Sequence, residues 1–214
     1  MWTKLSFLGL PVVFGFLLDQ IIGDPHSLYH PVQLIGRYID FFEKIFRAIC
    51  PKTKAGERTG GILCALCVMT VSTLLPWLVL FLLYHPENWL KNADAGKAGA
   101  VIRALAFFLE TFWCCQIVAL KSLRDESMKV AKELNRKDLD GARQAVSMIV
   151  GRDTEKLTET GVAKAAVETV AENCSDGIIA PLFYMMLFGA VGGFFYKSVN
   201  TMDSMIGYRN DRYR

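Results

Sequence analysis

Four short polar stretches hold the side chains of this chain that could do chemistry, and the densest is ETVAENCSDGIIAPLF, residues 168–183. Its candidate site residues are Glu168, Glu172, Asn173, Ser175 and Asp176. On a helix, Glu168 and Glu172 would share one face and repel each other unless a cation or an arginine intervenes. Oxygen groups of this type suit Mg²⁺, which proteins commonly hold with one or two carboxylates together with substrate phosphates. An exposed acidic helix face is the alternative.

A second stretch, NTMDSMIGYRNDRY at residues 200–213, interleaves acids with arginines. Its candidate site residues are Asn200, Asp203, Arg209 and Arg212. Carboxylates and guanidinium groups placed together can bind a metal and a phosphate at one site. They can equally form a salt-bridged loop without a ligand.

Two further stretches supply isolated candidates. GDPHSLYHPVQLIGR, residues 23–37, contains Asp24 and His30 in a turn marked by glycine and proline, and a structural turn with His30 hydrogen-bonded locally explains it as well. In IVGRDT, residues 149–154, the glycine and the aspartate are typical of a helix end followed by a helix start. Arg152 between them is a candidate anion ligand, because a guanidinium beside a helix N-terminus suits a phosphate or a carboxylate.

Long apolar runs must position these stretches. The chain has 214 residues, 52% of them hydrophobic, and its mean hydropathy of +0.28 is too high for a typical soluble domain. Four runs approach the roughly 20 residues that cross a bilayer. They cover residues 5–22, 60–84, 99–120 and 178–199. The sequence therefore predicts an all-α, polytopic helical membrane protein with a single membrane domain over residues 1–214.

The charges between the runs predict which side of the membrane each connection faces. Residues 23–59 hold six lysines and arginines and residues 121–177 hold ten, whereas residues 85–98 hold only Lys91 and Lys97. Basic connections stay on the cytoplasmic side, so the first two are expected inside and the third outside. The net charge of +3 is too small to indicate a nucleic-acid partner.

Residues 121–177 are too long for an unstructured connection and show helical periodicity, which predicts a cytoplasmic insert of two or three amphipathic helices. Asp138 is expected to cap a helix over residues 139–150, with Gly151 just past its end.

The fourth apolar run has a proline near its start and three glycines, Gly189, Gly192 and Gly193, in its middle. This composition is typical of a broken or re-entrant membrane segment, which would return the C-terminal stretch to the cytoplasmic side. Arg103 and Glu110 lie seven residues apart inside the third run. Because isolated charges in a bilayer are costly, both are expected to face other helices, as an ion pair or toward a substrate.

In this order and spacing, the four polar stretches resemble the cobalamin biosynthesis membrane proteins called adenosylcobinamide-phosphate synthases, of the CobD/CbiB type. The resemblance covers essentially the whole chain. It implies a multi-pass enzyme of the cell (inner) membrane, with its site facing the cytoplasm, that joins a propionate carboxylate of adenosylcobyric acid to the amine of aminopropanol or its phosphate. ATP and Mg²⁺ are the implied cofactors. Members continue past NTMDSMIGYRN into further helices, so the family's C-terminal region is expected to be absent here.

Such a ligase must activate the carboxylate, most simply as an acyl phosphate, before the amine attacks, and this needs charge neutralisation and positioning more than a protein nucleophile. If the resemblance holds, the expected ligands of Mg²⁺ are Glu172, Asp176 and Asp203. Glu168 would support them or act as the base on the amine. The expected phosphate and substrate contacts are Arg152, Arg209, Arg212, Ser175, Asp24, His30, Asn173 and Asn200. The expected partners are the corrinoid, the amino alcohol, the lipid bilayer and other membrane enzymes of the pathway.

Two other function classes compete with this interpretation. A non-enzymatic inner-membrane regulatory or sensor protein of a related family could keep the apolar runs and lose the acids, but Glu172, Asp176 and Asp203 are all present. A transporter would account for the broken run and the charges in the third run, but no inverted repeat is evident.

Overall fold

The computed structural model of the chain describes residues 2–23, 30–90 and 96–207, apart from the side chains of residues 2–8. Within these ranges the chain is helical and contains no strand. The elements in order are α1 (Trp2–Ile22), α2 (Pro31–Ile49), α3 (Lys54–Tyr84), the short η1 (Pro86–Asn88), α4 (Lys97–Ile117), α5 (Leu120–Asn135), α6 (Leu139–Ser147), α7 (Glu159–Cys174), the π-helical turn η2 (Ser175–Ile179) and α8 (Ala180–Ile206). The predicted all-α fold is confirmed.

Three helical stretches are long and apolar enough to cross a membrane, at Lys54–Tyr84, Lys97–Asn135 and Glu159–Ile206. They contain the second, third and fourth predicted runs. The first predicted run is helical as well, but among the described residues its apolar part is the shorter stretch Gly9–Ile22. These lengths and compositions fit a polytopic membrane protein.

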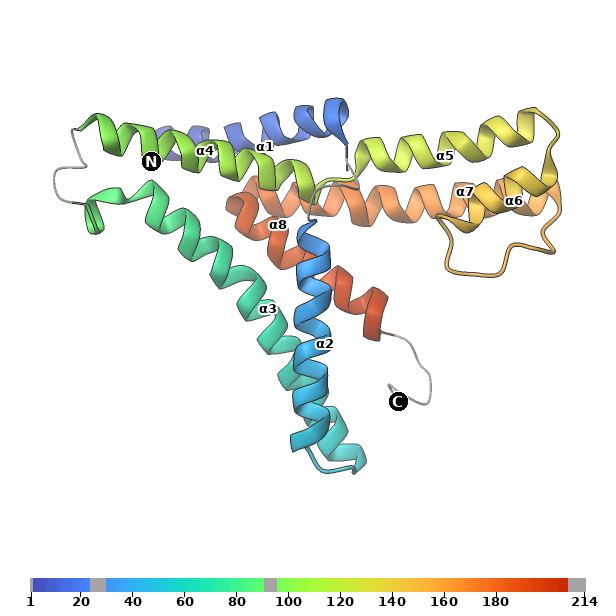
Figure 1. Cartoon of the computed structure of the whole chain (residues 1–214), viewed down its shortest axis with the longest axis horizontal. Coiled ribbons are helices and arrows are strands. Elements are labelled where there is room, and N and C mark those ends of the chain that lie inside the picture. The colour runs from blue at the N-terminus through green and yellow to red at the C-terminus, as the bar shows by residue number, and fades with distance from the viewer. Residues whose placement is uncertain (1, 24–29, 91–95, 208–214) are drawn as a thin grey trace.

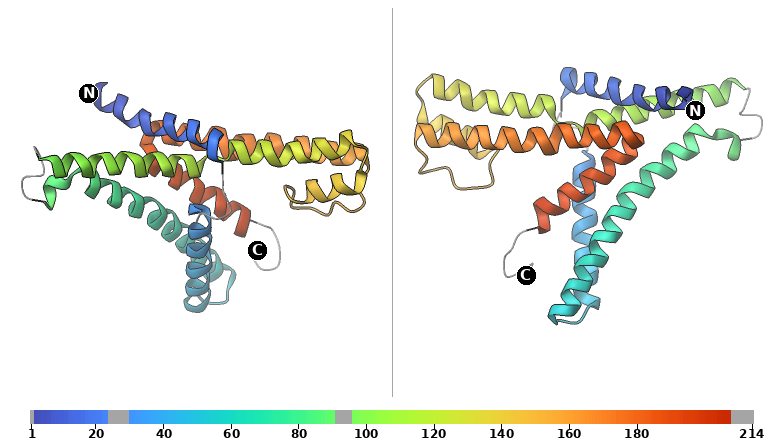
Figure 2. Two further views of the ribbon diagram at one scale, coloured as in Figure 1. Left: turned by 45° about the horizontal axis from the view of Figure 1, so that its top comes forward. Right: turned by 180° about the vertical axis from the view of Figure 1, so that it is seen from behind.

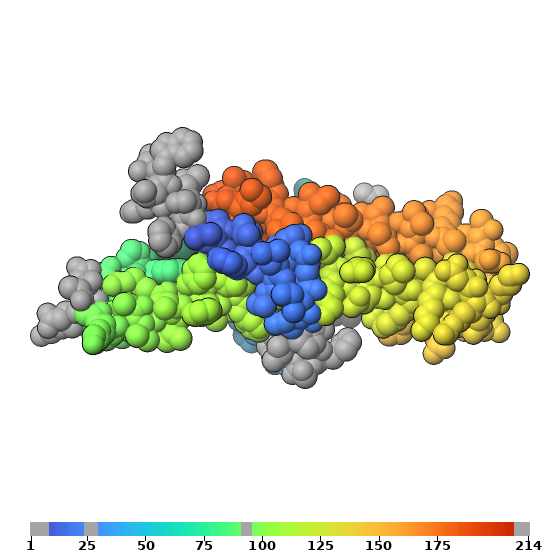
Figure 3. Space-filling model, turned by 90° about the horizontal axis from the view of Figure 1, so that it is seen from above, coloured from blue at the N-terminus to red at the C-terminus, as the bar shows by residue number. Residues whose placement is uncertain are grey.

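Two long columns organise the molecule. Figure 1 shows α4 followed by α5 in one column and α7 followed by the start of α8 in the other, running side by side in opposite directions. α1 covers the junction between α4 and α8, as the space-filling view in Figure 3 shows. Gly15 allows this close contact, because a Cβ there would lie 2.8 Å from the Thr111 carbonyl oxygen of α4.

The predicted insert consists of α5, α6 and α7, which pack around their own small core of Val130, Ala142, Val146, Val162 and Ala165. Asp138 caps α6 as predicted, since its Oδ1 accepts the Gly141 amide at 2.9 Å. Two predicted boundaries are wrong. α6 ends at Ser147 rather than at residue 150, and Asp153 starts no helix, because its carboxylate accepts the Glu155 amide in a loop. The next helix begins after Thr158, whose hydroxyl oxygen accepts the Gly161 amide.

The fourth apolar run breaks and turns back, as its glycines predict. Gly189 has φ +65° and ψ −159°, and the chain after it returns along the first half of α8 (Figure 2, right). The arms meet where the ring of Tyr184 stacks on that of Tyr196, with centroids 5.3 Å apart. Gly192 permits this approach, because a Cβ there would overlap the Tyr184 carbonyl oxygen. We call residues 180–206 the re-entrant hairpin.

α2 runs across the direction of the two columns and forms an antiparallel pair with the start of α3 (Figure 1). Its buried side chains Ile35 and Ile39 pack against Cys64 and Val68 of α3 and against Met202 of the hairpin. The returning arm of the hairpin therefore ends against α2.

Candidate functional site

The densest polar stretch of the sequence forms one outward stripe on α7 and η2. Glu168, Glu172 and Asp176 follow at intervals of four residues, so they lie on one helix face spanning about 12 Å along the axis. Glu168 and Glu172 are exposed, and Asp176 is half-buried where the helix reaches the apolar run. We call these three carboxylates the acidic stripe.

Arg152 closes the outer end of the acidic stripe. Its Nη2 donates to Glu168 Oε2 at 2.9 Å, and Lys164 Nζ lies 3.8 Å from the other oxygen of the same carboxylate. Both members of the pair are about half exposed, with 54% and 50% of the side chain accessible. Two motifs that are 16 residues apart in the sequence thus meet in the structure, and the repulsion expected within the stripe is offset at this end.

Asp176 lies in η2, a π-helical turn where α7 passes into α8. Such single wide turns release a backbone carbonyl from its helix and are frequent at functional sites. Here the Gly177 carbonyl oxygen accepts the Ala119 amide at 3.2 Å, in the extended link between α4 and α5. From the hairpin, the Tyr196 hydroxyl donates to Asp176 Oδ1 at 3.4 Å. Sequence reasoning missed Tyr196, because only the return of the hairpin brings it to an acid 20 residues away.

Sequence reasoning also missed the contact between the end of α1 and the start of α5. Asp19 is fully buried at the end of α1, and its Oδ2 accepts the Leu120 and Lys121 amides at 3.1 and 3.2 Å, which caps α5. In return, Lys121 Nζ donates to the Ile21 carbonyl oxygen at 2.6 Å and so caps the end of α1. The one signal in the sequence was an acid in the last turn of an apolar helix.

The remaining candidates are dispersed. His30 caps α2, and its Nδ1 accepts the Val32 amide at 3.2 Å, which is the local role considered for it. Asn173 donates to the Thr169 carbonyl oxygen, Ser175 is exposed, and Asn200 is half-buried in the returning arm. Asp24, Arg209 and Arg212 lie outside the described residues.

Asp203 is exposed near the end of the returning arm, about 10 Å along the helix beyond Tyr196. In Figures 1 and 2 this end of α8 diverges from α7. Over residues 2–23, 30–90 and 96–207, no three His, Cys, Asp or Glu side chains form a group that could hold a metal ion. Magnesium binding by Glu172, Asp176 and Asp203 therefore stays a prediction.

The two charges of the third apolar run have different partners. Arg103 Nη1 donates to Glu87 Oε2 of η1 at 3.4 Å, at the end of α4 far from the insert. The pKa of Glu87 lies below its ordinary value, first because the carboxylate accepts its own backbone amide and then because His85 is beside it. Glu110 instead accepts hydrogen bonds from α3 and α8.

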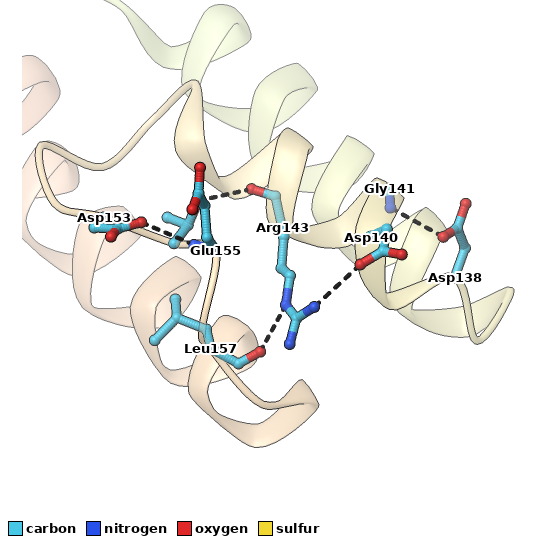
Figure 4. A network of polar contacts seen from close by, with 8 residues as sticks. Asp138, Asp140, Gly141, Arg143, Asp153, Glu155 and Leu157 are labelled. Atoms are coloured by element: carbon cyan, nitrogen blue, oxygen red, sulfur yellow. Dashed lines mark hydrogen bonds and ion pairs between the residues drawn. The ribbon is translucent and has the colours of Figure 1, made fainter.

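A shallow hollow of about 470 Å³ lies between α6 and the loop before α7 (Figure 4). Its wall contains three acids and two arginines, so it is not electropositive. Arg143 there is already engaged, because its Nε donates to the Leu157 carbonyl oxygen and its Nη1 to Asp140. Phosphate binding at Arg143 is therefore disfavoured, whereas Arg152, the other arginine of the wall, lies against the acidic stripe.

A family model described as "CobD/Cbib protein" matches residues 12–214. Curated relatives named cobalamin biosynthesis protein CobD include that of Geobacter metallireducens, 43% identical over 207 residues, covering 96% of this chain and 58% of the relative. The protein of that name from Clostridium perfringens is 36% identical, covering 96% and 59%, and the one from Listeria monocytogenes is 40% identical, covering 94% and 58%. The chain thus spans a little under three fifths of the length of these relatives. No solved structure matches it.

Proposed function

This chain belongs to the CobD/CbiB protein family, and we propose that it contributes to cobalamin biosynthesis as a membrane ligase. The reaction would join the propionate carboxylate of adenosylcobyric acid to the amine of aminopropanol or its phosphate. The protein would lie in the cell membrane, with the acidic stripe facing the cytoplasm, because the insert that carries the stripe is rich in lysine and arginine.

The observation that carries this proposal is the ion pair between Arg152 and Glu168. It places a guanidinium at one end of the acidic stripe. The other end of the stripe, at Asp176, reaches the apolar re-entrant hairpin. A ligase that uses a nucleotide needs a positively charged side chain to bind phosphate and carboxylates to bind magnesium. Both must be close enough to contact the same nucleotide. Arg152 retains further N–H donors for a phosphate while Glu168 holds it in place.

The donor set between Glu172 and Asp176 fits magnesium in kind. It offers two carboxylates and the side-chain oxygens of Asn173 and Ser175 within about one and a half turns, all exposed or half-buried. Mg²⁺ is commonly held by one or two carboxylates with waters and phosphates completing its shell, so a preformed three-acid cluster is not required. When bound there, ATP would supply the phosphoryl group that activates the propionate carboxylate, and Mg²⁺ would neutralise the charge of its phosphates.

The residues of the chain would then orient the two reactants. Arg152 would neutralise phosphate charge, and Asp176, fixed by the Tyr196 hydroxyl, would hold the metal or accept a proton from the attacking amine. Asn173 and Asn200 would donate to corrinoid amide groups. Asp203 would contribute a ligand to the metal, and Arg209 and Arg212 would contact phosphate. Held reactants gain rate mainly from proximity and orientation, which needs no covalent protein intermediate.

Complementation tests the proposal. A strain blocked at the amidation of adenosylcobyric acid would receive either this chain or a chimaera that continues it with the C-terminal part of the Geobacter metallireducens relative. We expect the strain that carries the chimaera to grow without added cobinamide and to form adenosylcobinamide or its phosphate. An inserted chimaera that supports no growth would contradict the proposal.

A further inference from the structure

Glu110 is a buried acid in the middle of α4, with 5% of its surface exposed. Its Oε2 accepts the Tyr84 hydroxyl at 2.8 Å, from the end of α3. Its Oε1 accepts the backbone amide of Ala190 at 3.4 Å, in the re-entrant hairpin. One carboxylate therefore joins three apolar helices at a depth where polar groups are expensive unless they are paired.

The contact with Ala190 matters because of where this residue lies in the hairpin. Ala190 is the first residue after the break at Gly189, so its amide opens the helix of the returning arm. The first amides of a helix have no partner within the helix, and a negative group beside them also stabilises the helix dipole. Glu110 supplies the cap from α4.

The returning arm transmits this anchor to the candidate site. Ala190 and Tyr196 are six residues apart on one helix, about 9 Å along its axis, and Tyr196 donates to Asp176. A helix of this length moves as a rigid body, so a shift at Ala190 displaces Tyr196 from the acid. Because the two arms are in close contact at Gly192, the returning arm cannot shift there without moving its neighbour.

We propose that Glu110 is a positioning residue: by capping the returning arm at Ala190, it holds the re-entrant hairpin closed and so sets Tyr196 against Asp176. This inference rests on the proposed function for its catalytic consequence, but the closure of the hairpin is independent of it.

Three substitutions separate the position of the Glu110 acceptor oxygen from the presence of an acid. Glu110→Met removes both acceptors at similar volume. Glu110→Asp keeps the carboxyl group but withdraws it by about one carbon–carbon bond, roughly 1.5 Å, from an amide already 3.4 Å away. Glu110→Gln keeps a carbonyl oxygen for Ala190, and its NH₂ can donate to the Tyr84 oxygen. Tyr84→Phe, the matched control, removes only the contact to α3.

The first measurement is hydrogen–deuterium exchange of peptides spanning residues 186–197, with the chain in lipid nanodiscs. Losing the cap is expected to speed exchange just after Gly189 roughly tenfold in the Met and Asp variants, with peptides of α5 unchanged. The Gln variant and Tyr84→Phe should exchange like the parent. Unchanged exchange in the Asp variant, or equally fast exchange in the Gln variant, would overturn the cap. The Asp variant keeps an acid at this position, so the test stays decisive even if the Met variant fails to insert.

The second measurement is complementation by the same variants, made in this chain or in the chimaera, whichever supports growth. The Met and Asp variants should lose product formation, and the Gln variant should restore it. Wild-type synthesis by a variant whose hairpin is shown to open would overturn the positioning role. If no parent version supports growth, the proposed function fails while the exchange data still decide whether Glu110 closes the hairpin.

Discussion

A charge swap at the pair formed by Arg152 and Glu168 separates a structural role from an anion-binding role. The single variants Arg152→Glu and Glu168→Arg each break the 2.9 Å contact, and the double variant restores it with the charges exchanged. If the pair serves only to fasten the loop to α7, the double variant should recover both stability and activity. If Arg152 binds phosphate, the double variant should recover stability alone, because it places an acid where the anion binds.

The structure sets the magnitudes. About half of each side chain is accessible, so solvent screens the pair and its coupling should lie at about 0.2–1 kcal/mol. For a chain of this size, that is a melting-temperature change of no more than about 2–4 °C. Product formation should instead fall by about a hundredfold or more in Arg152→Glu, the usual effect of removing one group that stabilises transition-state charge.

The assays are a thermal melt of the purified protein in detergent and product formation by the version that complements. Lys164 is a complication, because it lies 3.8 Å from Glu168 and would repel an arginine there by a few tenths of a kcal/mol. The control is the same swap at Glu133 and Arg136 on α5, an exposed pair at 3.2 Å, which should change neither quantity. Recovery of synthesis by the double variant would refute phosphate binding by Arg152. A coupling energy above about 2 kcal/mol would refute our assignment of the pair as energetically minor.

Three further predictions use the same assays. Asp19→Leu leaves two partly buried amides of α5 without their acceptor, so we expect the free energy of unfolding to fall by about 1–2 kcal/mol and the melting temperature by about 2–8 °C. Asp19→Asn should keep most of the cap, and equal losses in the two variants would contradict this role. Gly192→Ala forces a Cβ into a carbonyl of the facing arm and should cost about 1–3 kcal/mol, while Gly61→Ala inside α3, which meets nothing within 4 Å, should stabilise the protein by up to about 1 kcal/mol. Asp176→Ala and Asp203→Ala should each abolish synthesis with membrane insertion intact, and synthesis retained by either variant would remove that acid from the mechanism.

Several features of the fold were predictable because they depend on local chemistry. The apolar runs gave the positions of the long helices, and Asp138 marked the start of α6 through its own hydrogen bond to Gly141. The break at Gly189 was predictable for the same reason, since a positive φ inside a membrane segment requires glycine. Where local signals were ambiguous the predictions were wrong: Asp153 has the composition of a helix cap, but its carboxylate closes a turn instead.

The candidate site was predictable only in part. The acidic stripe follows from the spacing of four along α7, and the neighbours of Arg152 marked it as a candidate anion ligand, which stays a prediction. Nothing in the spacing indicated that Arg152 would bind Glu168, or that Tyr196 would meet Asp176. Both contacts depend on how far the insert and the hairpin fold back, which is a property of the packed helices.

The sequence by itself determined that this chain is helical, with runs apolar enough to cross a membrane. It also determined that the fourth apolar run breaks at glycine and that the polar motifs match one family. Those properties are set by composition and short-range geometry. Only the tertiary structure decided which of the polar groups act together. Asp19, Glu110 and Tyr196 each hydrogen-bond to a residue between 20 and 102 positions away, and such partners are fixed by which buried donors and acceptors remain unpaired once the helices have packed.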